Sequence, residues 1–280
     1  YSLEDVCLEM SSLGKGDIRE PFIEVTYPNG SSTTDMVFDR AEIIQGKEEY
    51  DTLPGSYDDN GEVEQLVIYL KDRNYNLTLE LHYYVYEKCD IITRSAKLVN
   101  SGNESVRLER LMSMQLDLNE SDYELSFFNG AWAREMNRSR IPIRAGKYVN
   151  ESVTGTSSNR ANPFFMIGRS STTEDYGECY GFNLIYSGNH YEAAQVNSYG
   201  KLRLVSGINP ATFSYIIEAG KCFEAPEAVL TYSYKGYNRM SHNMHEFVRK
   251  HIVRGIWRDK ERPVLINSWE AAYFNINERK

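Results

Sequence analysis

Apolar and polar residues alternate along most of the chain between residues 20 and 235, and this pattern predicts β-strands. The clearest tract runs from residue 64 to residue 118, where clusters of turn-forming residues separate the alternating runs. These antiparallel strands are too many for one flat sheet, and we therefore expect two sheets packed face to face. The runs expected to form strands in this tract are Val67–Tyr69, Leu77–Val85, Ile91–Lys97 and Val106–Leu108.

An earlier stretch, PFIEVTYPNGSSTTDMVFDRAEII, holds two alternating runs on either side of Pro28, Asn29 and Gly30. Pro, Asn and Gly favour tight turns, and the flanking runs have the strand period. We therefore expect a β-hairpin that turns at these three residues.

The period of the apolar positions changes at residue 236, where GYNRMSHNMHEFVRKHIVRGIW places apolar residues three or four positions apart. We expect one amphipathic helix of about 13 residues, with Ser241 able to cap its start and Gly255 able to end it. A charged connector follows over residues 258–262, and PVLINSWEAAYF (Pro263–Phe274) is then continuously apolar. Such a run predicts a parallel strand buried on both faces, which needs α/β neighbours that this chain does not encode.

Composition and charge narrow the classes of partner. The chain is 41% hydrophobic and 25% charged, which is typical of a globular protein. The formal net charge of −9 argues against nucleic acid or an anionic membrane surface as partner, because phosphate binding needs a surplus of Lys and Arg. No run approaches the roughly 18 apolar residues of a transmembrane helix. The 21 tyrosines suit half-buried strands and also surfaces that hold sugars.

The cysteines indicate the compartment. Cys7, Cys89, Cys179 and Cys222 are scattered without C-x-x-C spacing, so we expect free, mostly buried thiols in a reducing compartment. The first residues show no basic or apolar region of a signal peptide.

No motif assigns an active site to the chain. It has no nucleophile motif and no phosphate-binding glycine loop, and no spacing singles out a pair of carboxylates. His242 and His245 lie at i and i+3 on the expected helix, a spacing that can share a metal, but no further ligand accompanies them. His82 and His190 stand alone on expected strands and are interpreted as structural. We expect no catalytic residue, no metal and no cofactor.

Two tryptophans and one short loop are the remaining candidates. Trp132 lies near a turn, and Trp269 lies toward the C-terminal end of the last expected strand, where α/β folds bind ligands. An indole face can stack on the apolar face of a pyranose, although a core or interface anchor is the alternative for each. Asp17 and Arg19 lie in a loop that Gly14 and Gly16 make flexible enough to reach a neighbour; an exposed ion pair is the alternative.

Several stretches together resemble the α-galactosidases of glycoside hydrolase family 36. GKGDIREPFIEV is similar to that family's Gly-Asp-Phe-Arg segment, although Ile18 replaces Phe. NGAWAREM and TSSNRANPFF are similar to its Gly-Ala-Trp-x-Arg-Glu and Ser-Ser-x-x-x-Asn-Pro-Phe-Phe segments. HEFVRKHIVRG followed by RPVLINSWEAAYF is similar to its linker helix and first barrel strand. The resemblance covers essentially the whole chain.

This resemblance implies a fold and a division of the chain. Residues 1–235 would form an all-β, two-sheet antiparallel β-supersandwich of the galactose-mutarotase-like kind. Residues 236–262 would form a linker helix and connector, and residues 263–280 the first strand of a truncated (β/α)8 barrel. We accordingly expect a fragment of a longer protein, with Tyr1 not a native start.

The resemblance also implies a function for the parent protein. It would be a cytoplasmic bacterial enzyme, often a dimer or tetramer, that hydrolyses terminal α-linked galactose from raffinose-type oligosaccharides or melibiose with retention. Both catalytic aspartates lie in motifs absent here, so this chain alone is expected to be inactive. Trp269 and Trp132 would line the galactose pocket, and Asp17 and Arg19 would be interface or pocket-loop residues.

Two other functions stay open at this point. A stand-alone carbohydrate-binding β-sandwich module would explain the tyrosines and the tryptophans. A mutarotase-like epimerase would need a histidine base and a carboxylate facing one groove of the sandwich, and His82 and His190 are the candidate histidines on strands.

Overall fold

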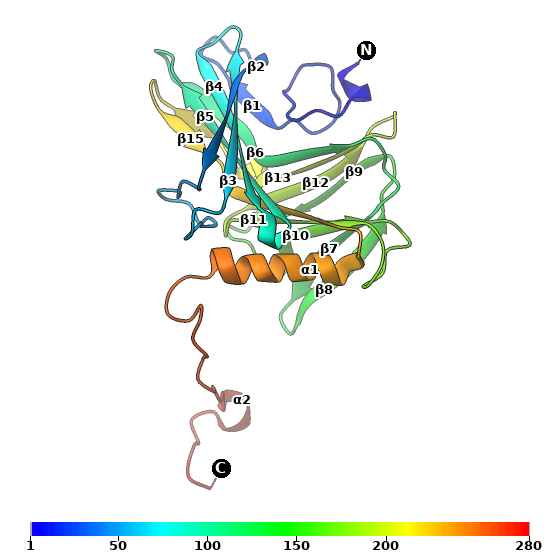
Figure 1. The fold of residues 1–280 in the computed structure, drawn as a ribbon, viewed down its shortest axis with the longest axis vertical. Coiled ribbons are helices and arrows are strands. Elements are labelled where there is room, and N and C mark those ends of the chain that lie inside the picture. Colours follow the sequence, from blue (N-terminus) through cyan, green and yellow to red (C-terminus); the bar gives the residue numbers. More distant parts are fainter. Residues whose placement is uncertain (1, 280) are drawn as a thin grey trace.

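The computed structural model describes residues 2–279 and contains two antiparallel β-sheets that pack face to face (Figure 1). The larger sheet has the strand order β2 (Met36–Gln45), β3 (Glu64–Asp72), β4 (Leu77–Tyr86), β5 (Ile91–Asn100), β16 (Glu227–Ser233), β11 (Cys179–Ile185), β10 (Ala161–Gly168), β7 (Glu124–Ala131) and β8 (Arg134–Pro142), and β15 (Cys222–Glu224) also pairs with β5. The smaller sheet has the order β1 (Ile23–Thr26), β6 (Val106–Leu118), β13 (Leu202–Ile208), β12 (His190–Val196) and β9 (Gly146–Glu151), and β14 (Tyr215–Ile217) also pairs with β6. The expected two-sheet, all-β architecture is confirmed.

The alternating tract of residues 64–118 forms β3, β4, β5 and β6, as its period predicts. Strand β4 shows what the alternation achieves. Leu79 and Leu81 point into the core between the sheets, while Tyr84 and Tyr86 point to the opposite face and join a second apolar cluster there. Because both faces are buried, tyrosines that looked half-exposed from the sequence are only 3% exposed.

The predicted hairpin at Pro28–Gly30 is wrong in its pairing. The turn exists, since the backbone N–H of Gly30 donates to the carbonyl of Tyr27 at 2.8 Å. However, β1 pairs with β6 in the smaller sheet and β2 pairs with β3 in the larger one. The turn therefore passes the chain from one sheet to the other, a choice that long-range pairing makes and local turn chemistry does not.

The expected helix is α1 (Gly236–Phe247), followed by a single π-helical turn over Val248–Ile252. It lies against the larger sheet, where Met240, Met244 and Phe247 pack in one cluster with residues of β4, β10, β11 and β16 (Figure 1). Its ends differ from the prediction, because Ser241 lies inside the helix and Gly255 lies beyond its end.

The helix begins at Gly236 because the backbone of a neighbouring turn caps it. The N–H groups of Tyr237 and Asn238 donate to the carbonyls of Thr173 and Glu174 at 3.1 and 2.8 Å. Gly236 has a φ of +74°, and a Cβ there would lie 2.6 Å from each of the same two carbonyl oxygens. Only glycine allows this close approach. Because the two carbonyls accept from N–H groups of the first helical turn, these groups need no side-chain cap.

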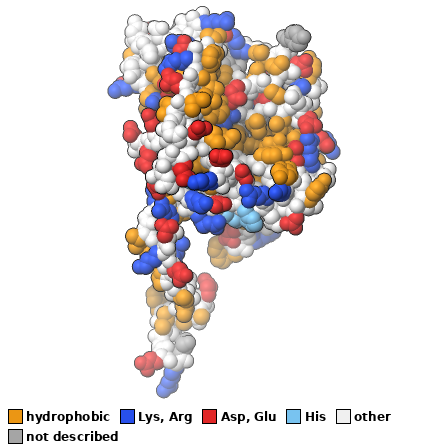
Figure 2. All heavy atoms as spheres, in the orientation of Figure 1, with side chains coloured by type: hydrophobic (Ala, Val, Ile, Leu, Met, Phe, Trp, Pro, Cys, Tyr) orange, Lys and Arg blue, Asp and Glu red, His pale blue; other side chains and the backbone are white. Residues whose placement is uncertain are grey.

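Residues 263–274 do not form the predicted strand. Residues 261–268 have no regular structure, and Trp269–Ala272 forms the short helix α2. The side chains of Val264, Leu265 and Ile266 are 95%, 88% and 84% exposed, and Figure 2 shows hydrophobic side chains open to solvent along this segment. A strand needs neighbours for its N–H and C=O groups, and no strand of residues 2–279 lies beside this run.

None of the helices within residues 2–279 is both long enough and apolar enough to cross a membrane.

The packing of α1 on the larger sheet is testable by truncating its last buried residue. Phe247 is 1% exposed, so Phe247→Ala should lower the free energy of unfolding by about 3–5 kcal/mol. The neighbouring Val248 is 40% exposed, and Val248→Ala is the control, with an expected loss of about 0.5 kcal/mol or less. Chemical denaturation followed by circular dichroism measures both. Equal losses in the two variants would contradict this packing.

Candidate functional site

Trp132 lies at the tip of the hairpin that joins β7 to β8, and its side chain is 90% exposed. The tip is a tight turn, because Ala131 pairs with Arg134 and Ala133 between them adopts the left-handed backbone region with φ of 58°. The N–H of Ala133 donates to the Glu135 carboxylate at 2.9 Å, which helps to hold this conformation. The hairpin therefore presents an indole to solvent on a backbone of defined shape, and Trp132 is not a core anchor of the described residues.

The hairpin contacts residues 159–162, which include the first two residues of β10. Asn129 on β7 donates from its side-chain amide to the carbonyl of Arg160 at 2.9 Å, and Asn162 donates to the carbonyl of Phe128 at 3.0 Å. A Cβ on Gly130 would lie only 2.7 Å from the carbonyl oxygen of Asn159, so this glycine permits the close approach.

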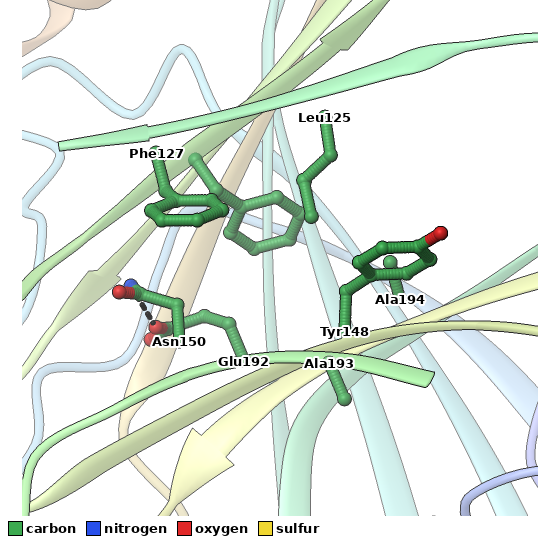
Figure 3. Close-up of a pocket in the computed structure, with 8 residues that line it drawn as sticks. Leu125, Phe127, Tyr148, Asn150, Glu192, Ala193 and Ala194 are labelled. Atoms are coloured by element: carbon green, nitrogen blue, oxygen red, sulfur yellow. Dashed lines mark hydrogen bonds between the residues drawn. The ribbon is translucent and has the colours of Figure 1, made fainter. Parts of the chain in front are cut away.

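A buried polar cluster of the smaller sheet contacts this segment through Asn162 and Ala161. Asn150 on β9 donates to a carboxylate oxygen of Glu192 on β12 at 2.8 Å, the bond drawn in Figure 3. The same carboxylate lies 2.9 Å from Nδ1 of His190, and these three residues are at most 7% exposed. A cavity of about 10 Å³ lies between Glu192 and Asn150 and the rings of Phe127 and Tyr148. This volume is about the minimum that one water molecule needs.

The histidine ring of this cluster has an acceptor at each nitrogen. Nε2 lies 3.0 Å from the carbonyl oxygen of Ala161, and Nδ1 faces the Glu192 carboxylate. Burial lowers the pKa of His190, but the hydrogen bond and charge of Glu192 outweigh burial and hold the pKa above its ordinary value. Burial likewise raises the pKa of Glu192, and its bonds to His190 and Asn150 offset this only in part. The pair thus retains its shared proton at a pH where a free imidazole would lose it.

The structural interpretation of His190 and His82 agrees with these contacts. His190 is fully buried, and His82 on β4 is 8% exposed between Gln65 and Glu80. Neither ring faces an open groove. Glu192 was missed, although its spacing from His190 was a usable signal, because residues two apart on a strand share a face.

Asp17 and Arg19 do not form an exposed ion pair, and that alternative is corrected. Their role as interface or pocket-loop residues stays a prediction. Arg19 donates to both carboxylate oxygens of Asp17 at 3.0 Å, and the two side chains are 0% and 2% exposed. Arg203 on β13 lies 2.8 Å from Asp17 and donates to both oxygens of Asp117 on β6 at 2.7 Å. Two buried arginines therefore share two buried aspartates, and the charges balance.

This ion cluster fastens the N-terminal segment to the smaller sheet. Arg19 also donates to the carbonyls of Leu3 and Val6 at 3.0 Å, and the N–H of Leu8 donates to Asp117 at 3.0 Å. Burial raises the pKa of Asp17, but the hydrogen bonds from Arg19 and the charges of both arginines outweigh burial and hold the pKa below its ordinary value of 3.8. These contacts indicate that the cluster holds residues 3–8 in place.

Trp269 begins α2 and is 46% exposed. Its ring contacts are within its own segment, with Tyr273 and Phe274 at centroid distances of 5.3 and 4.9 Å. Among residues 2–279, no ring contact joins Trp269 to Trp132, so the structure does not bring the two candidate sugar-binding tryptophans together.

The helical histidines do not form a metal site. His242 and His245 are exposed on α1, and within residues 2–279 no group of three His, Cys, Asp or Glu side chains could share a metal ion. The cysteines are free, but only Cys89 and Cys179 are buried, while Cys7 and Cys222 are exposed.

A large groove opens on the inner face of the larger sheet, beyond the edge of the core. Its volume is about 930 Å³, and Tyr83, Tyr180 and Tyr232 are among the residues that line it. Arg94 lies in its floor and donates to the hydroxyl of Tyr83 at 3.0 Å and to Glu9. The mixture of tyrosine faces and charged groups could accept a polar ligand.

Comparisons with known proteins agree with one another. Residues 1–218 match the model of the glycosyl hydrolase family 36 N-terminal domain, and residues 222–280 match the Melibiase model. The chain is 40% identical to alpha-galactosidase AgaA of Geobacillus stearothermophilus and 36% identical to alpha-galactosidase Mel36A of Lactobacillus acidophilus, over 281 residues in each case. Both alignments cover 100% of this chain and 38% of the relative, so the chain spans well under half of their length.

Solved structures of similar proteins have the same fold. The α-galactosidase of Lactobacillus brevis matches with a TM-score of 0.95 and 40% identity, over 100% of this chain and 38% of that one. A variant of AgaA in complex with raffinose matches with a TM-score of 0.95 and 40% identity, over 100% of this chain and 39% of that one.

The buried ion cluster predicts a specific acid sensitivity. Asp17→Asn leaves two buried arginines with one aspartate, so it should cost about 3–5 kcal/mol of unfolding free energy at neutral pH. Because the folded pKa of Asp17 is lowered from 3.8, its contribution is complete above that pH and is lost as the pH falls below it. The stability of the variant should therefore fall less than that of the wild type as the pH drops below 3.8.

Denaturant titrations at several pH values measure this difference. Asp39→Asn is the matched control, since Asp39 pairs with Arg40 and Lys71 at the surface, where solvent screens an ion pair and it contributes little to stability. A loss for Asp17→Asn no larger than that of the control would contradict the structural role of the cluster.

Proposed function

The chain belongs to glycosyl hydrolase family 36, and from this we propose that it is part of an α-galactosidase. The enzyme would remove terminal α-linked galactose, with retention, from raffinose-type oligosaccharides or melibiose. The observation that carries the proposal is the match of the family model to residues 1–218. A relative of 40% identity, crystallised with raffinose, supports the substrate class.

The role of this chain in that enzyme is to support and complete a pocket. Retaining hydrolysis needs two carboxyl groups about 5 Å apart on opposite faces of the sugar. The family places its two catalytic aspartates in motifs that this sequence lacks, so the chain supplies no acid–base residue or nucleophile. It supplies aromatic surface instead, with Trp132 on a preformed hairpin and Trp269 on the segment after α1 lining the galactose pocket.

The division of the chain is part of the proposal. Residues 1–235 would be the β-supersandwich domain, residues 236–262 the linker helix and connector, and residues 263–280 the first strand of the catalytic barrel. The exposure of Val264, Leu265 and Ile266 supports the last assignment, because a buried barrel strand needs apolar residues of this kind. Trp269 would reach the pocket only once that strand has neighbours.

Cytoplasmic location and assembly into a dimer or tetramer are also proposed. The four free cysteines support a reducing compartment. The family resemblance is the basis for the oligomer.

A stand-alone carbohydrate-binding module is the second candidate, and the tyrosine-lined groove on the larger sheet favours it. We rank it below the enzyme because the chain resembles its relatives along its whole length, including the segment after α1. The epimerase is not supported, because His82 and His190 are buried in hydrogen-bonded clusters.

If Trp132 and Trp269 line the galactose pocket, replacing either one should weaken substrate binding. In the α-galactosidase that contains this chain, Trp132→Ala and Trp269→Ala should each raise KM for raffinose about ten-fold, since losing a stacked aromatic face costs about 1.4 kcal/mol. Trp257→Ala is the control, because Trp257 lies under the Lys260 side chain in the connector. Steady-state kinetics decide, and an unchanged KM in both variants would sink the pocket assignment.

A second prediction concerns the isolated 280-residue chain. It should not hydrolyse raffinose, and calorimetric titration with galactose should give a dissociation constant no tighter than about 1 mM. Most polar contacts to the sugar would come from residues outside it. Submillimolar binding that is lost in Trp132→Ala would instead support the carbohydrate-binding module.

A further inference from the structure

The β7–β8 hairpin has little apolar packing of its own to fix its position. Most residues of β8 are exposed, and β8 is the last strand of the larger sheet, so it pairs only with β7. Trp132 and Met136, the large apolar residues near the tip, are 90% and 56% exposed. The position of the indole therefore depends on what holds β7 from its other side.

On that side the regular ladder between β7 and β10 is interrupted. Ala161 pairs with Asn129, and the next regular pair is Phe165 with Phe127, with a register shift between them. Pro163 lies in this gap and has no N–H to give to a ladder. Side-chain amides bridge the gap instead, through the bonds of Asn129 and Asn162 described above.

The same gap is held from behind by the smaller sheet. Nε2 of His190 lies 3.0 Å from the carbonyl oxygen of Ala161, and the side-chain amide of Asn150 donates to the carbonyl of Asn162 at 2.8 Å. Both contacts cross from one sheet to the other and end on two of the residues that touch the hairpin, Ala161 and Asn162. Glu192 bonds to His190 and to Asn150, so it orients both donors.

We infer that the His190–Glu192–Asn150 cluster positions the 161–162 segment, and through it the hairpin that presents Trp132. These three are positioning residues, since none of them is exposed. The consequence for sugar binding rests on the proposed function, whereas the consequence for the hairpin does not.

The protonation state of the cluster determines how many hydrogen bonds hold the 161–162 segment in place. When His190 and Glu192 share a proton, the ring donates from both nitrogens, to Ala161 and to Glu192. When that proton is lost, one lone pair of the ring must face an oxygen, and one of the two bonds is lost. The charged groups that bear on the ring are Glu192 on its own strand and Glu151 on β9, while the 161–162 segment meets it with a carbonyl. Both carboxylates favour the protonated ring.

The sign of the pH effect follows from the raised pKa of His190. The contribution of the protonated ring is complete below the unfolded value of about 6.5 and is lost as the pH rises through the folded pKa. The hairpin should therefore loosen on the alkaline side.

Hydrogen exchange of the 280-residue chain, read by mass spectrometry on peptides that cover residues 127–136, tests the inference. After correction for the intrinsic rate, exchange in these peptides should accelerate about ten-fold or more in His190→Phe, which keeps the ring volume and removes both hydrogen bonds. It should also accelerate in the wild type as the pH rises above about 6.5. Glu192→Gln should show the fast exchange already at neutral pH and little dependence on pH.

His82→Phe is the matched control, because His82 is also buried beside a glutamate, Glu80, but touches neither the hairpin nor residues 159–162. It should leave exchange at residues 127–136 unchanged. If His190→Phe fails to fold, the wild-type pH series and Glu192→Gln decide alone. Hairpin exchange that is insensitive to pH and to Glu192→Gln would overturn the inference.

Kinetics of the α-galactosidase that contains this chain separate this inference from the proposed function. Glu192→Gln should raise KM for raffinose, with kcat changed by less than about two-fold, as loss of ground-state positioning predicts. If Trp132→Ala raises KM and Glu192→Gln does not, the cluster does not position the indole for sugar. If Trp132→Ala has no effect, the pocket role of Trp132 fails, and the exchange data still decide whether the cluster holds the hairpin.

Discussion

Buried polar groups constrain this fold closely, because each needs a partner of matching geometry, whereas apolar side chains need mainly volume. Arg19 and Arg203 are buried only because Asp17 and Asp117 meet them. His190 is buried only because Glu192 and a backbone carbonyl receive its two nitrogens. Removing one partner from either cluster leaves a group that cannot reach water.

The two clusters act in the same way on segments that lack a complete strand ladder. The arginine–aspartate cluster binds backbone groups of residues 3–8, and Gln115 of β6 adds a bond to the carbonyl of Leu8. The histidine–glutamate cluster binds the carbonyls of Ala161 and Asn162. In both, buried polar side chains replace the backbone pairing that is missing, so an irregular segment acquires a fixed position.

A sandwich built this way suits the supporting role beside a sugar pocket that we propose for it. The smaller sheet packs on one face of the larger sheet and α1 packs on the other, and the hairpin projects an indole from this body. The apolar segment after α1 is the opposite case, since Val264, Leu265 and Ile266 have no partner within residues 2–279. A domain that completes a neighbouring pocket would have both features: a sandwich that holds the indole of Trp132 in a fixed position, and an apolar segment after α1 that is not yet buried.

The sequence by itself determined the strands of residues 64–118, the position of the linker helix and the family, because each is written in local period or in short motifs. It did not determine that β1 and β2 enter different sheets, that Gly236 starts α1 on the carbonyls of Thr173 and Glu174, or that Asp17 is buried. The sequence also did not show that Glu192 lies beside Asn150. It predicted a strand over residues 263–274, where the structure has none. Tertiary structure decided these points because the partners lie far apart in the sequence, and a buried polar group or a strand is stable only where the fold brings its partner.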